Sequence, residues 1–267
     1  MTEEQLRAYR KDGYIFFPSY FSEREVERLK SQLPTALAED GPGRIVEDGG
    51  GLLRSVYGSH FNNETFRNLA RHPRLVGPVR QALGSEIYLY QFKINVKAAF
   101  GGDVWQWHQD YIFWRNEDGM GDQQVMNAAV FLDEVNEFNA PLTLIPGSHR
   151  EGVIEVLAKR PDAGRPAWVS NLSARLKYSL DKETVARLVA GYGLVAPKGP
   201  AGSALFFHCN LVHSSSNNIS PFDRVIAFVT FNSVSNIPVP ANNPRPEFLA
   251  GRDYSPVAPV SDDVFLM

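Results

Sequence analysis

The chain has 267 residues, of which 43% are hydrophobic and 21% charged, and its formal net charge is −3. These proportions are typical of a globular protein and exclude a disordered chain, a collagen and a coiled coil. The slightly acidic balance argues against a nucleic-acid-binding protein. No segment approaches the roughly 20 consecutive apolar residues of a membrane helix, so we expect neither a nucleic acid nor a membrane as a partner.

The start of the chain and its cysteine content indicate a compartment. Met1–Gln5 is acidic and polar, unlike the charged and then apolar start of a signal peptide. The one cysteine, Cys209, has no second cysteine for an internal disulfide. Both features favour a cytoplasmic protein.

Helical patterns dominate the first third of the chain. A weakly amphipathic segment, Thr2–Asp12, ends at Gly13 and is followed by a predicted buried strand, Tyr14–Phe17. Ser22 and Glu25 have the spacing of a capping box, which predicts a helix over Glu23–Leu37 that Pro34 kinks or ends early. The glycines between Gly41 and Gly51 predict a flexible stretch that would permit a lid. Two short helices are expected over 63–71 and 73–83.

After Gly84 the pattern changes to the alternation of strands. We expect strands at Ile87–Ala98, Met126–Leu132, Leu142–Ile145, Ser203–Phe207 and Val225–Phe231, with a helix near Lys182–Ala190. Pro238–Pro259 is rich in proline and asparagine and is expected to wrap the surface as an extended segment. The order predicts one α+β domain over 1–267: a helical part (1–84), an antiparallel sandwich or barrel (85–235) and a tail (236–267).

One predicted strand carries a polar stripe. Because side chains alternate along a strand, one face of Ile87–Ala98 presents Gln91, Lys93, Asn95 and Lys97, and the other presents Phe92, Ile94, Val96 and Ala98. The polar face either contacts water or lines a ligand cavity inside a barrel. The second interpretation is favoured because the Gly101-Gly102 turn leads directly into the next motif.

That motif is His108-Gln109-Asp110, which on a strand would place the histidine and the aspartate on one face. Downstream lies His213, with Arg224 eleven residues further on. Two imidazoles and one carboxylate with open positions are the donor set of non-haem Fe(II) oxygenases. Arg224 would then pair bidentately with a carboxylate of the co-substrate.

The other histidines are weighed against this set. His208 rivals His213, but the spacing to Arg224 and the Ser214-Ser215 pair favour His213. His72 and His149 are interpreted as structural, and the role of His60 is open.

These residues lie within longer motifs that carry a resemblance. The chain resembles the phytanoyl-CoA dioxygenase superfamily of Fe(II)- and 2-oxoglutarate-dependent oxygenases, and within it the bacterial free L-proline trans-4-hydroxylases, with ectoine hydroxylases as relatives. The resemblance is carried by Tyr90–Asn95, Trp107–Trp114, Glu117–Met120, Ile145–His149, Gly199–Ser203 and Pro244–Ala250, and it spans nearly the whole chain. It implies a double-stranded β-helix, or jelly roll, with flanking helices.

The resemblance also assigns roles. His108, Asp110 and His213 would bind Fe(II), and Arg224 would bind the distal carboxylate of 2-oxoglutarate. Further contacts to this co-substrate are expected from Asn95, Asn127, Ser215 and Lys97, and contacts to the substrate from Gln91 and Trp114. A free amino acid also needs a cation for its carboxylate, for which Arg54, Lys93 and Lys97 are candidates, and Trp114 offers an aromatic face to its ammonium group.

The implied activity is the hydroxylation of a free amino acid with 2-oxoglutarate and O₂, giving succinate and CO₂, and the resemblance favours L-proline to trans-4-hydroxy-L-proline. Ile226 stands where ectoine hydroxylases use an asparagine, which argues against ectoine. The carboxylate of Asp110 predicts hydroxylation, since related halogenases have a small residue at this position. Alternatives are a hydroxylase of pipecolate, of another small amino acid or of a natural-product intermediate; a zinc hydrolase; and a non-catalytic jelly-roll protein.

Overall fold

The computed structural model describes residues 1–159, 168–169, 172–239 and 244–267. Its first helix, α1 (Glu3–Asp12), begins with a capping box between Thr2 and Gln5 and ends at Gly13, whose φ of 77° lets the chain turn back. Strand β1 (Tyr14–Phe17) follows directly. Both elements confirm the sequence-based predictions.

The helix predicted over Glu23–Leu37 is divided at Gln32. Helix α2 (Glu23–Ser31) has the expected capping box of Ser22 and Glu25, and α3 (Leu33–Ala38) begins one residue after Gln32. Pro34 lies in the first turn of α3, where the missing N–H of proline has no helical partner to lose. Three further helices follow: α4 (Ser59–Asn62), α5 (Glu64–Ala70) and α6 (Pro73–Leu83).

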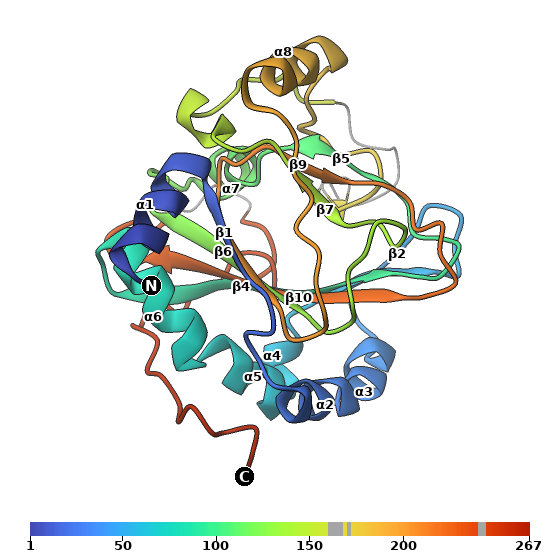
Figure 1. Ribbon diagram of the computed structural model, residues 1–267, viewed down its shortest axis with the longest axis vertical. Coiled ribbons are helices and arrows are strands. Elements are labelled where there is room, and N and C mark those ends of the chain that lie inside the picture. The colour runs from blue at the N-terminus through green and yellow to red at the C-terminus, as the bar shows by residue number, and fades with distance from the viewer. Residues whose placement is uncertain (160–167, 170–171, 240–243) are drawn as a thin grey trace.

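Two antiparallel sheets face each other (Figure 1). The larger has the order β1-β8-β6-β10-β4-β3-β2, and the smaller has the order β5-β9-β7. The remaining strands of the large sheet are β2 (Arg44–Val46), β3 (Leu53–Tyr57), β4 (Ile87–Lys97), β6 (Val125–Phe131), β8 (Ala204–His208) and β10 (Arg224–Ser233). Those of the small sheet are β5 (Trp105–His108), β7 (Leu142–Leu144) and β9 (His213–Ser215).

The core has two layers because the strands of the large sheet bury both faces. Helices α2 to α6 cover the outer face, where Phe92 and Ile94 of β4 pack with helical residues such as Leu29. On the inner face, Phe207 and Phe228 pack against residues of the small sheet. This arrangement is the predicted mainly β jelly roll with flanking helices.

Several elements differ from the sequence-based expectation. Arg44–Val46, within the predicted flexible stretch, is a strand that pairs with β3. The sequence did not predict three elements: helix α7 (Tyr111–Asp118), strand β5 and strand β9. It did predict helix α8 (Lys182–Tyr192). Asp110 is not in a strand: its backbone is helical (φ −71°, ψ −38°) and it precedes α7. The division of the chain into domains stays a prediction.

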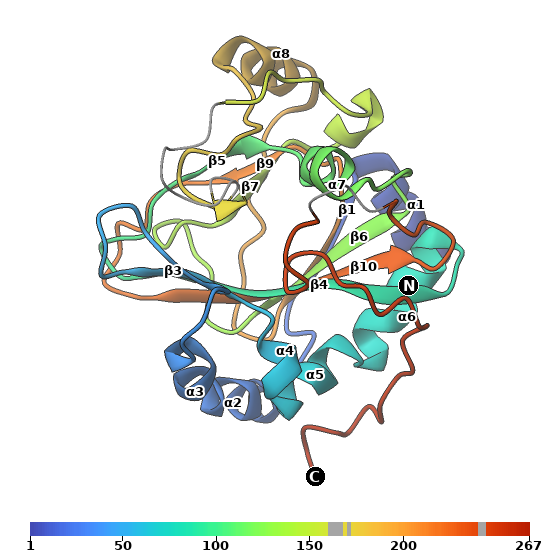
Figure 2. The same ribbon diagram turned by 180° about the vertical axis from the view of Figure 1, so that it is seen from behind.

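The C-terminal segment is more than a surface wrapping. From residue 244 onward it runs past β4 and α6 (Figure 2), where the amides of Gly251 and Val257 donate hydrogen bonds to the carbonyls of Tyr90 and Ile87. Further upstream, Val239 donates to the carbonyl of Gly119, the residue that ends α7. Gly119 has a φ of 76°, and a Cβ at this position would overlap the carbonyl oxygen of Val239.

Candidate active site

The structure brings the predicted metal ligands together. His108 ends β5 and His213 begins β9, and the two residues are paired directly across the small sheet. Asp110 reaches the same point from the start of α7. Its Oδ1 lies 3.5 Å from Nε2 of His108, and its Oδ2 lies 3.8 Å from Nε2 of His213. Ligand atoms of the three residues all lie within 4.8 Å of one another, close enough to surround one ion.

Backbone carbonyls orient both imidazoles. Nδ1 of His108 lies 2.6 Å from the carbonyl oxygen of Gln106, and Nδ1 of His213 lies 2.9 Å from that of Leu211. A carbonyl only accepts, so each Nδ1 carries the hydrogen and each Nε2 directs its lone pair toward Asp110. This is the arrangement that fixes metal-binding histidines in proteins.

The charge states also suit a metal. Burial, reinforced by His108, lowers the pKa of His213 to about 4, so its imidazole is neutral at neutral pH. Burial opposes the ionisation of Asp110, but His213, His108 and Lys93 outweigh it and hold the pKa of this carboxyl well below its usual value. Neutral imidazoles and an ionised carboxylate are the forms that bind a divalent cation.

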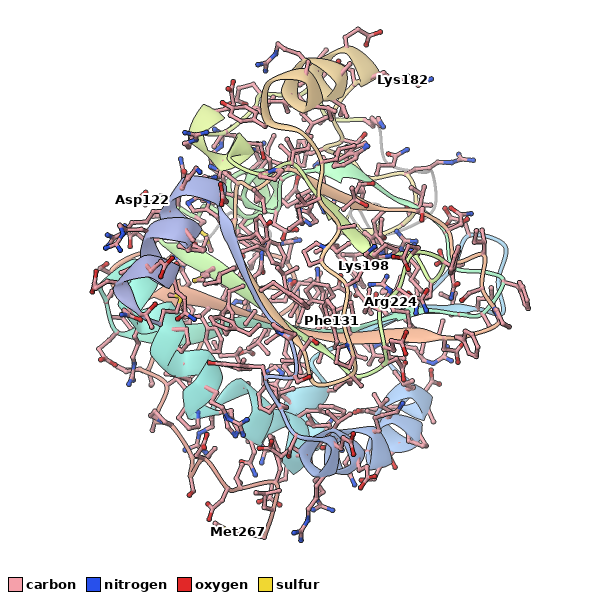
Figure 3. All side chains as sticks on the ribbon, viewed as in Figure 1. Asp122, Phe131, Lys182, Lys198, Arg224 and Met267 are labelled. Atoms are coloured by element: carbon pink, nitrogen blue, oxygen red, sulfur yellow. The ribbon has the colours of Figure 1, made fainter. Side chains whose placement is uncertain are left out.

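A small pocket between the sheets adjoins the three residues. Its polar lining includes Asn95 of β4, Ser215 of β9 and Arg224 at the start of β10. Arg224 is labelled in Figure 3. Oδ1 of Asn95, Oγ of Ser215 and Nε of Arg224 are buried, and none has a hydrogen-bond partner among the described residues. Buried polar atoms are normally paired. This pocket therefore fits a polar ligand beside the metal.

The charge of Arg224 indicates that this ligand is an anion. Its side chain is almost wholly buried, and burial lowers its pKa only to about 10, so the guanidinium remains charged at neutral pH. No carboxylate of the described residues forms a salt bridge with it. A planar guanidinium in this position suits a carboxylate, as a dicarboxylic co-substrate would supply.

A second pocket meets the metal residues from the other side. His108 and Asp110 line it together with Gln91, Lys93, Trp114 and further residues: Tyr57, Trp105, Phe113, Leu172, Leu176 and Arg245. Nε2 of Gln91 donates to the carbonyl of Leu249 at 2.6 Å. Lys93 lines both pockets, and its Nζ lies 5.9 Å from the ring centroid of Trp105 and 5.1 Å from that of Phe228. It has no hydrogen-bond partner in the part of the chain that the structure describes.

Two predicted cations are engaged elsewhere. The guanidinium of Arg54 binds both carboxylate oxygens of Glu47 and the carbonyls of Leu172, Asp103 and Val104, and it stacks 3.7 Å over Trp105. Lys97 donates to the carbonyls of Asp103 and Ser216. Neither lines the two pockets described above. The geometry therefore argues against Arg54 as a substrate contact and against Lys97 as a contact to either ligand.

Asn127 has a partner other than the expected one. Its Nδ2 donates to Oδ2 of Asp110 at 2.8 Å, and its side chain does not line the pocket beside Arg224. A direct contact to 2-oxoglutarate stays a prediction, and the structure gives this residue a contact to the predicted metal ligand.

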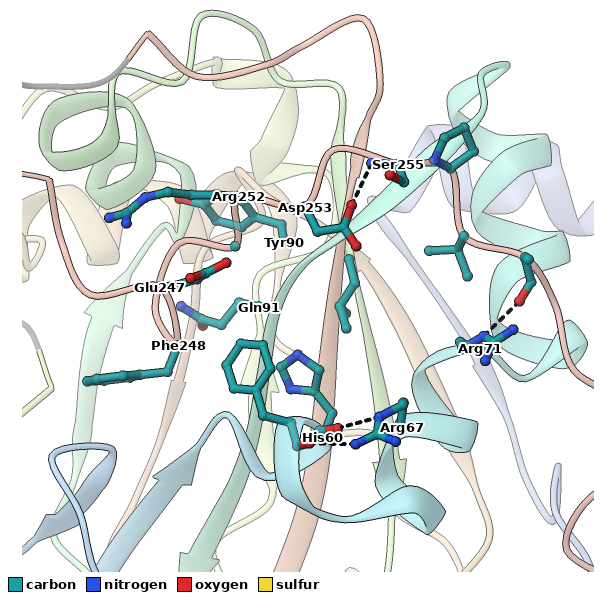
Figure 4. Close-up of a pocket in the computed structure, with 16 residues that line it drawn as sticks. His60, Arg67, Arg71, Tyr90, Gln91, Glu247, Phe248, Arg252, Asp253 and Ser255 are labelled. Carbon is teal, nitrogen blue, oxygen red and sulfur yellow. Dashed lines mark hydrogen bonds between the residues drawn. The ribbon is translucent and has the colours of Figure 1, made fainter.

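The remaining histidines lie outside the site. His208 accepts a hydrogen bond from the amide of Asn210, and burial, with His149, lowers its pKa to about 4. His60 lines a separate pocket of about 410 Å³ on the far side of Gln91 (Figure 4). Gln91 is the one residue common to this pocket and the pocket beside Trp114.

Sequence reasoning missed one group of residues. Arg245, from the C-terminal segment, lines the pocket beside Trp114, and its Nε and Nη2 bind the two oxygens of Asp118 at 2.8 and 2.5 Å. Tyr90 donates to the same carboxylate. Asp118 and Arg245 both lie in motifs that carry the family resemblance, but their pairing across 127 residues has no signal in a single sequence.

A jelly roll that holds two histidines and one aspartate beside an arginine with no hydrogen-bond partner among the described residues defines a class, the non-haem iron oxygenases. A family model described as phytanoyl-CoA dioxygenase (PhyH) matches residues 9–226. The chain belongs to this family. The membership confirms the predicted enzyme class and disfavours a zinc hydrolase and a non-catalytic protein.

Two individual relatives are similar over nearly the whole chain. The chain is 40% identical over 255 residues to an L-proline trans-4-hydroxylase of Streptomyces griseoviridis, which covers 96% of this chain and 94% of that one. It is 35% identical over 259 residues to an ectoine dioxygenase of Sphingopyxis alaskensis, covering 94% and 83% of the two chains.

Solved structures of an ectoine dioxygenase have the same fold as this chain. EctD from S. alaskensis with 2-oxoglutarate and 5-hydroxyectoine superposes with a TM-score of 0.83 and 32% identity, covering 97% of this chain and 87% of that one. The same protein with bound Fe has a TM-score of 0.81 at 32% identity, covering 98% and 87%. In the described parts of the present chain, no helix has the length and apolar character needed to cross a membrane.

Proposed function

We propose that this protein is an Fe(II)- and 2-oxoglutarate-dependent hydroxylase of a free amino acid, and that its substrate is L-proline, converted to trans-4-hydroxy-L-proline. The observation that carries the proposal is the pair of pockets that share the metal residues. Arg224 lines one of them and Lys93 lines both, and among the described residues neither cation has a hydrogen-bond partner. The similarity to a relative named L-proline trans-4-hydroxylase supports the choice of amino acid.

In this proposal His108 and His213 would hold the iron through their Nε2 atoms, and Asp110 would hold it through its carboxylate. The side chains of Asn95, Ser215 and Arg224, whose buried polar atoms lack partners among the described residues, would bind 2-oxoglutarate, with the guanidinium on its distal carboxylate. Fe(II), when bound with 2-oxoglutarate and O₂, supplies the oxidising power for C–H hydroxylation and yields succinate and CO₂. The protein contributes orientation, and its buried side chains exclude water.

The substrate would occupy the pocket beside Trp114. Of the three cations considered from the sequence, Lys93 is the one that lines this pocket, so we assign it to the substrate carboxylate. The Trp114 ring and the amide of Gln91 line the same pocket and would contact the amino group and the ring. Ile226 is fully buried in the core between the sheets, so it offers no polar contact of the kind expected for ectoine.

The test is a reaction of protein loaded anaerobically with Fe(II) and 2-oxoglutarate, then exposed to air with L-proline, L-pipecolate or ectoine in parallel. Succinate and product mass are measured together. We expect succinate and a proline product heavier by one oxygen atom, with NMR placing the hydroxyl on C4, trans to the carboxylate. Succinate with hydroxylated pipecolate or ectoine alone would retain the oxygenase and overturn the proline assignment.

The Lys93→Met variant tests the substrate pocket, with Arg54→Lys as the matched control. Loss of the ammonium is expected to raise the KM for proline by about 10-fold or more, the size of one charged hydrogen bond. The KM for 2-oxoglutarate should change less. The control should retain the KM for proline, because Arg54 is engaged with Glu47.

A further inference from the structure

A chain of side-chain hydrogen bonds leads from the large sheet to Asp110. Oγ1 of Thr230 donates to Oδ1 of Asn127 at 2.7 Å, and Nδ2 of Asn127 donates to Oδ2 of Asp110 at 2.8 Å. Thr230 and Asn127 are direct cross-strand partners on β10 and β6. Their exposed fractions are 1% and 2%, so water does not compete for these bonds.

The direction of each bond follows from the chemistry of the groups. An ionised carboxylate only accepts hydrogen bonds, so the group that faces Asp110 must be the Nδ2 of Asn127. The amide oxygen then faces Thr230, whose hydroxyl acts as the donor. Thr230 therefore determines the orientation of the Asn127 amide, and Asn127 determines which oxygen of Asp110 is engaged.

The two oxygens of Asp110 are thereby made different. Oδ2 accepts the Asn127 hydrogen bond, whereas Oδ1 lies 3.5 Å from Nε2 of His108, whose lone pair cannot donate to it. Both oxygens face an imidazole nitrogen, since Oδ2 lies 3.8 Å from Nε2 of His213, but only Oδ2 is also engaged by the sheet through Asn127.

We propose that Asn127 and Thr230 are positioning residues that keep Asp110 a one-oxygen ligand of the metal, and so preserve the coordination position that 2-oxoglutarate needs to chelate it. The inference rests on the proposed iron site. An Asp110 that turned both oxygens to the metal would occupy a place required by the co-substrate or by O₂, because this chemistry depends on open positions.

The proposal explains the residue types. An aspartate at position 127 would place a second negative charge against Asp110, and a leucine would leave Oδ2 without a donor. A valine at position 230 would have almost the shape of threonine but could not donate to the amide oxygen of Asn127. The amide could then rotate and present its oxygen to Asp110, which would repel the carboxylate.

The experiment compares Asn127→Leu and Thr230→Val with wild type and with Thr230→Ser, which keeps the hydroxyl. Under anaerobic conditions, Fe(II) affinity is measured by titration calorimetry, and chelation of 2-oxoglutarate by the visible charge-transfer absorption of its Fe(II) complex. We expect Asn127→Leu to weaken chelation by about 10–100-fold while its Fe(II) affinity stays the same or rises. Thr230→Val should shift in the same direction by less, and Thr230→Ser should match wild type.

A parallel loss of Fe(II) affinity and chelation would overturn the proposal, because it would mean that Asn127 merely supports the fold. Unchanged chelation in both variants would overturn it as well. If Asn127→Leu does not fold, the Thr230→Val and Thr230→Ser pair decides, since these changes are small. Failure of wild type itself to form the Fe(II)–2-oxoglutarate complex would instead refute the proposed function.

Discussion

Lys97 and Arg224 face each other across the β4–β10 ladder, so two buried basic side chains stand side by side, and Arg224 lines the pocket beside the metal residues. Lys97 directs its ammonium group to the carbonyls of Asp103 and Ser216, which lie on the loops that follow β4 and β9. Arg224 keeps its guanidinium free of such bonds within the described chain. The lysine thus connects two loops, and the arginine is available to a ligand.

This pairing predicts a pH dependence of stability. Burial, together with Arg224 and Arg54, lowers the pKa of Lys97 from 10.5 to about 7. Between these values the unfolded chain binds a proton that the folded chain does not, so the stabilising contribution of Lys97 rises with pH. Relative to Lys97→Met, the free energy of unfolding of the wild type should rise by at most about 1.4 kcal/mol per pH unit in this window. Urea unfolding of both proteins across the window measures the slope, and parallel slopes would contradict the assigned shift.

Arg224 should govern the affinity for 2-oxoglutarate. Replacement by lysine keeps the charge but removes the planar pair of donors, so the KM for 2-oxoglutarate should rise about 10-fold or more. Arg224→Met should raise it further. Steady-state kinetics with each substrate varied in turn makes the measurement. An equal rise in the KM for the amino acid would show that the arginine does not act on the co-substrate alone.

The two neighbouring histidines give a matched pair of variants. His213→Ala removes an Nε2 that faces Asp110, and we expect Fe(II) binding and turnover to be lost. His208→Ala removes a ring that bonds the amide of Asn210, so Fe(II) binding should persist even if the protein is less stable. Metal content after reconstitution and desalting distinguishes the two. Retention of iron by His213→Ala together with its loss in His208→Ala would reverse the assignment.

The ion pair of Arg54 and Glu47 should act on stability and not on catalysis. Both side chains are buried, with Nη1 of Arg54 lying 2.9 Å from Oε2 of Glu47. Arg54→Met would leave the carboxylate buried without its cation, which typically costs about 3–5 kcal/mol. Chemical denaturation measures the loss. A normal unfolding free energy combined with a raised KM for the amino acid would return Arg54 to the substrate pocket.

Some of the site could be predicted because it depends on local periodicity. The polar stripe of β4 follows from alternation along one strand, and Gln91, Lys93 and Asn95 do line the two pockets. The same logic was wrong for Asp110, because the chain leaves β5 at His108 and bends into α7. The carboxylate reaches the metal residues through that bend and not through strand alternation.

Other features have no local signal. Strands β2 and β9 have three residues each, too few to show a period, and they exist through pairing with distant segments. Arg54 looks like a free cation in the sequence, and only the β2–β3 hairpin brings Glu47 back to it. Asn127 appears as one polar residue in an apolar strand, and its contact to Asp110 depends on how β6 faces α7.

Gly119 sets how closely the C-terminal segment approaches the end of α7. The carbonyl oxygen of Val239 lies in the space that any side chain at this position would fill, and the amide of Val239 donates to the carbonyl of Gly119. The φ of 76° at Gly119 is also one that residues with a side chain rarely adopt, so even Gly119→Ala would displace Val239 and strain the backbone. The close approach of helix and tail therefore depends on a hydrogen atom in the place where every other residue carries a side chain.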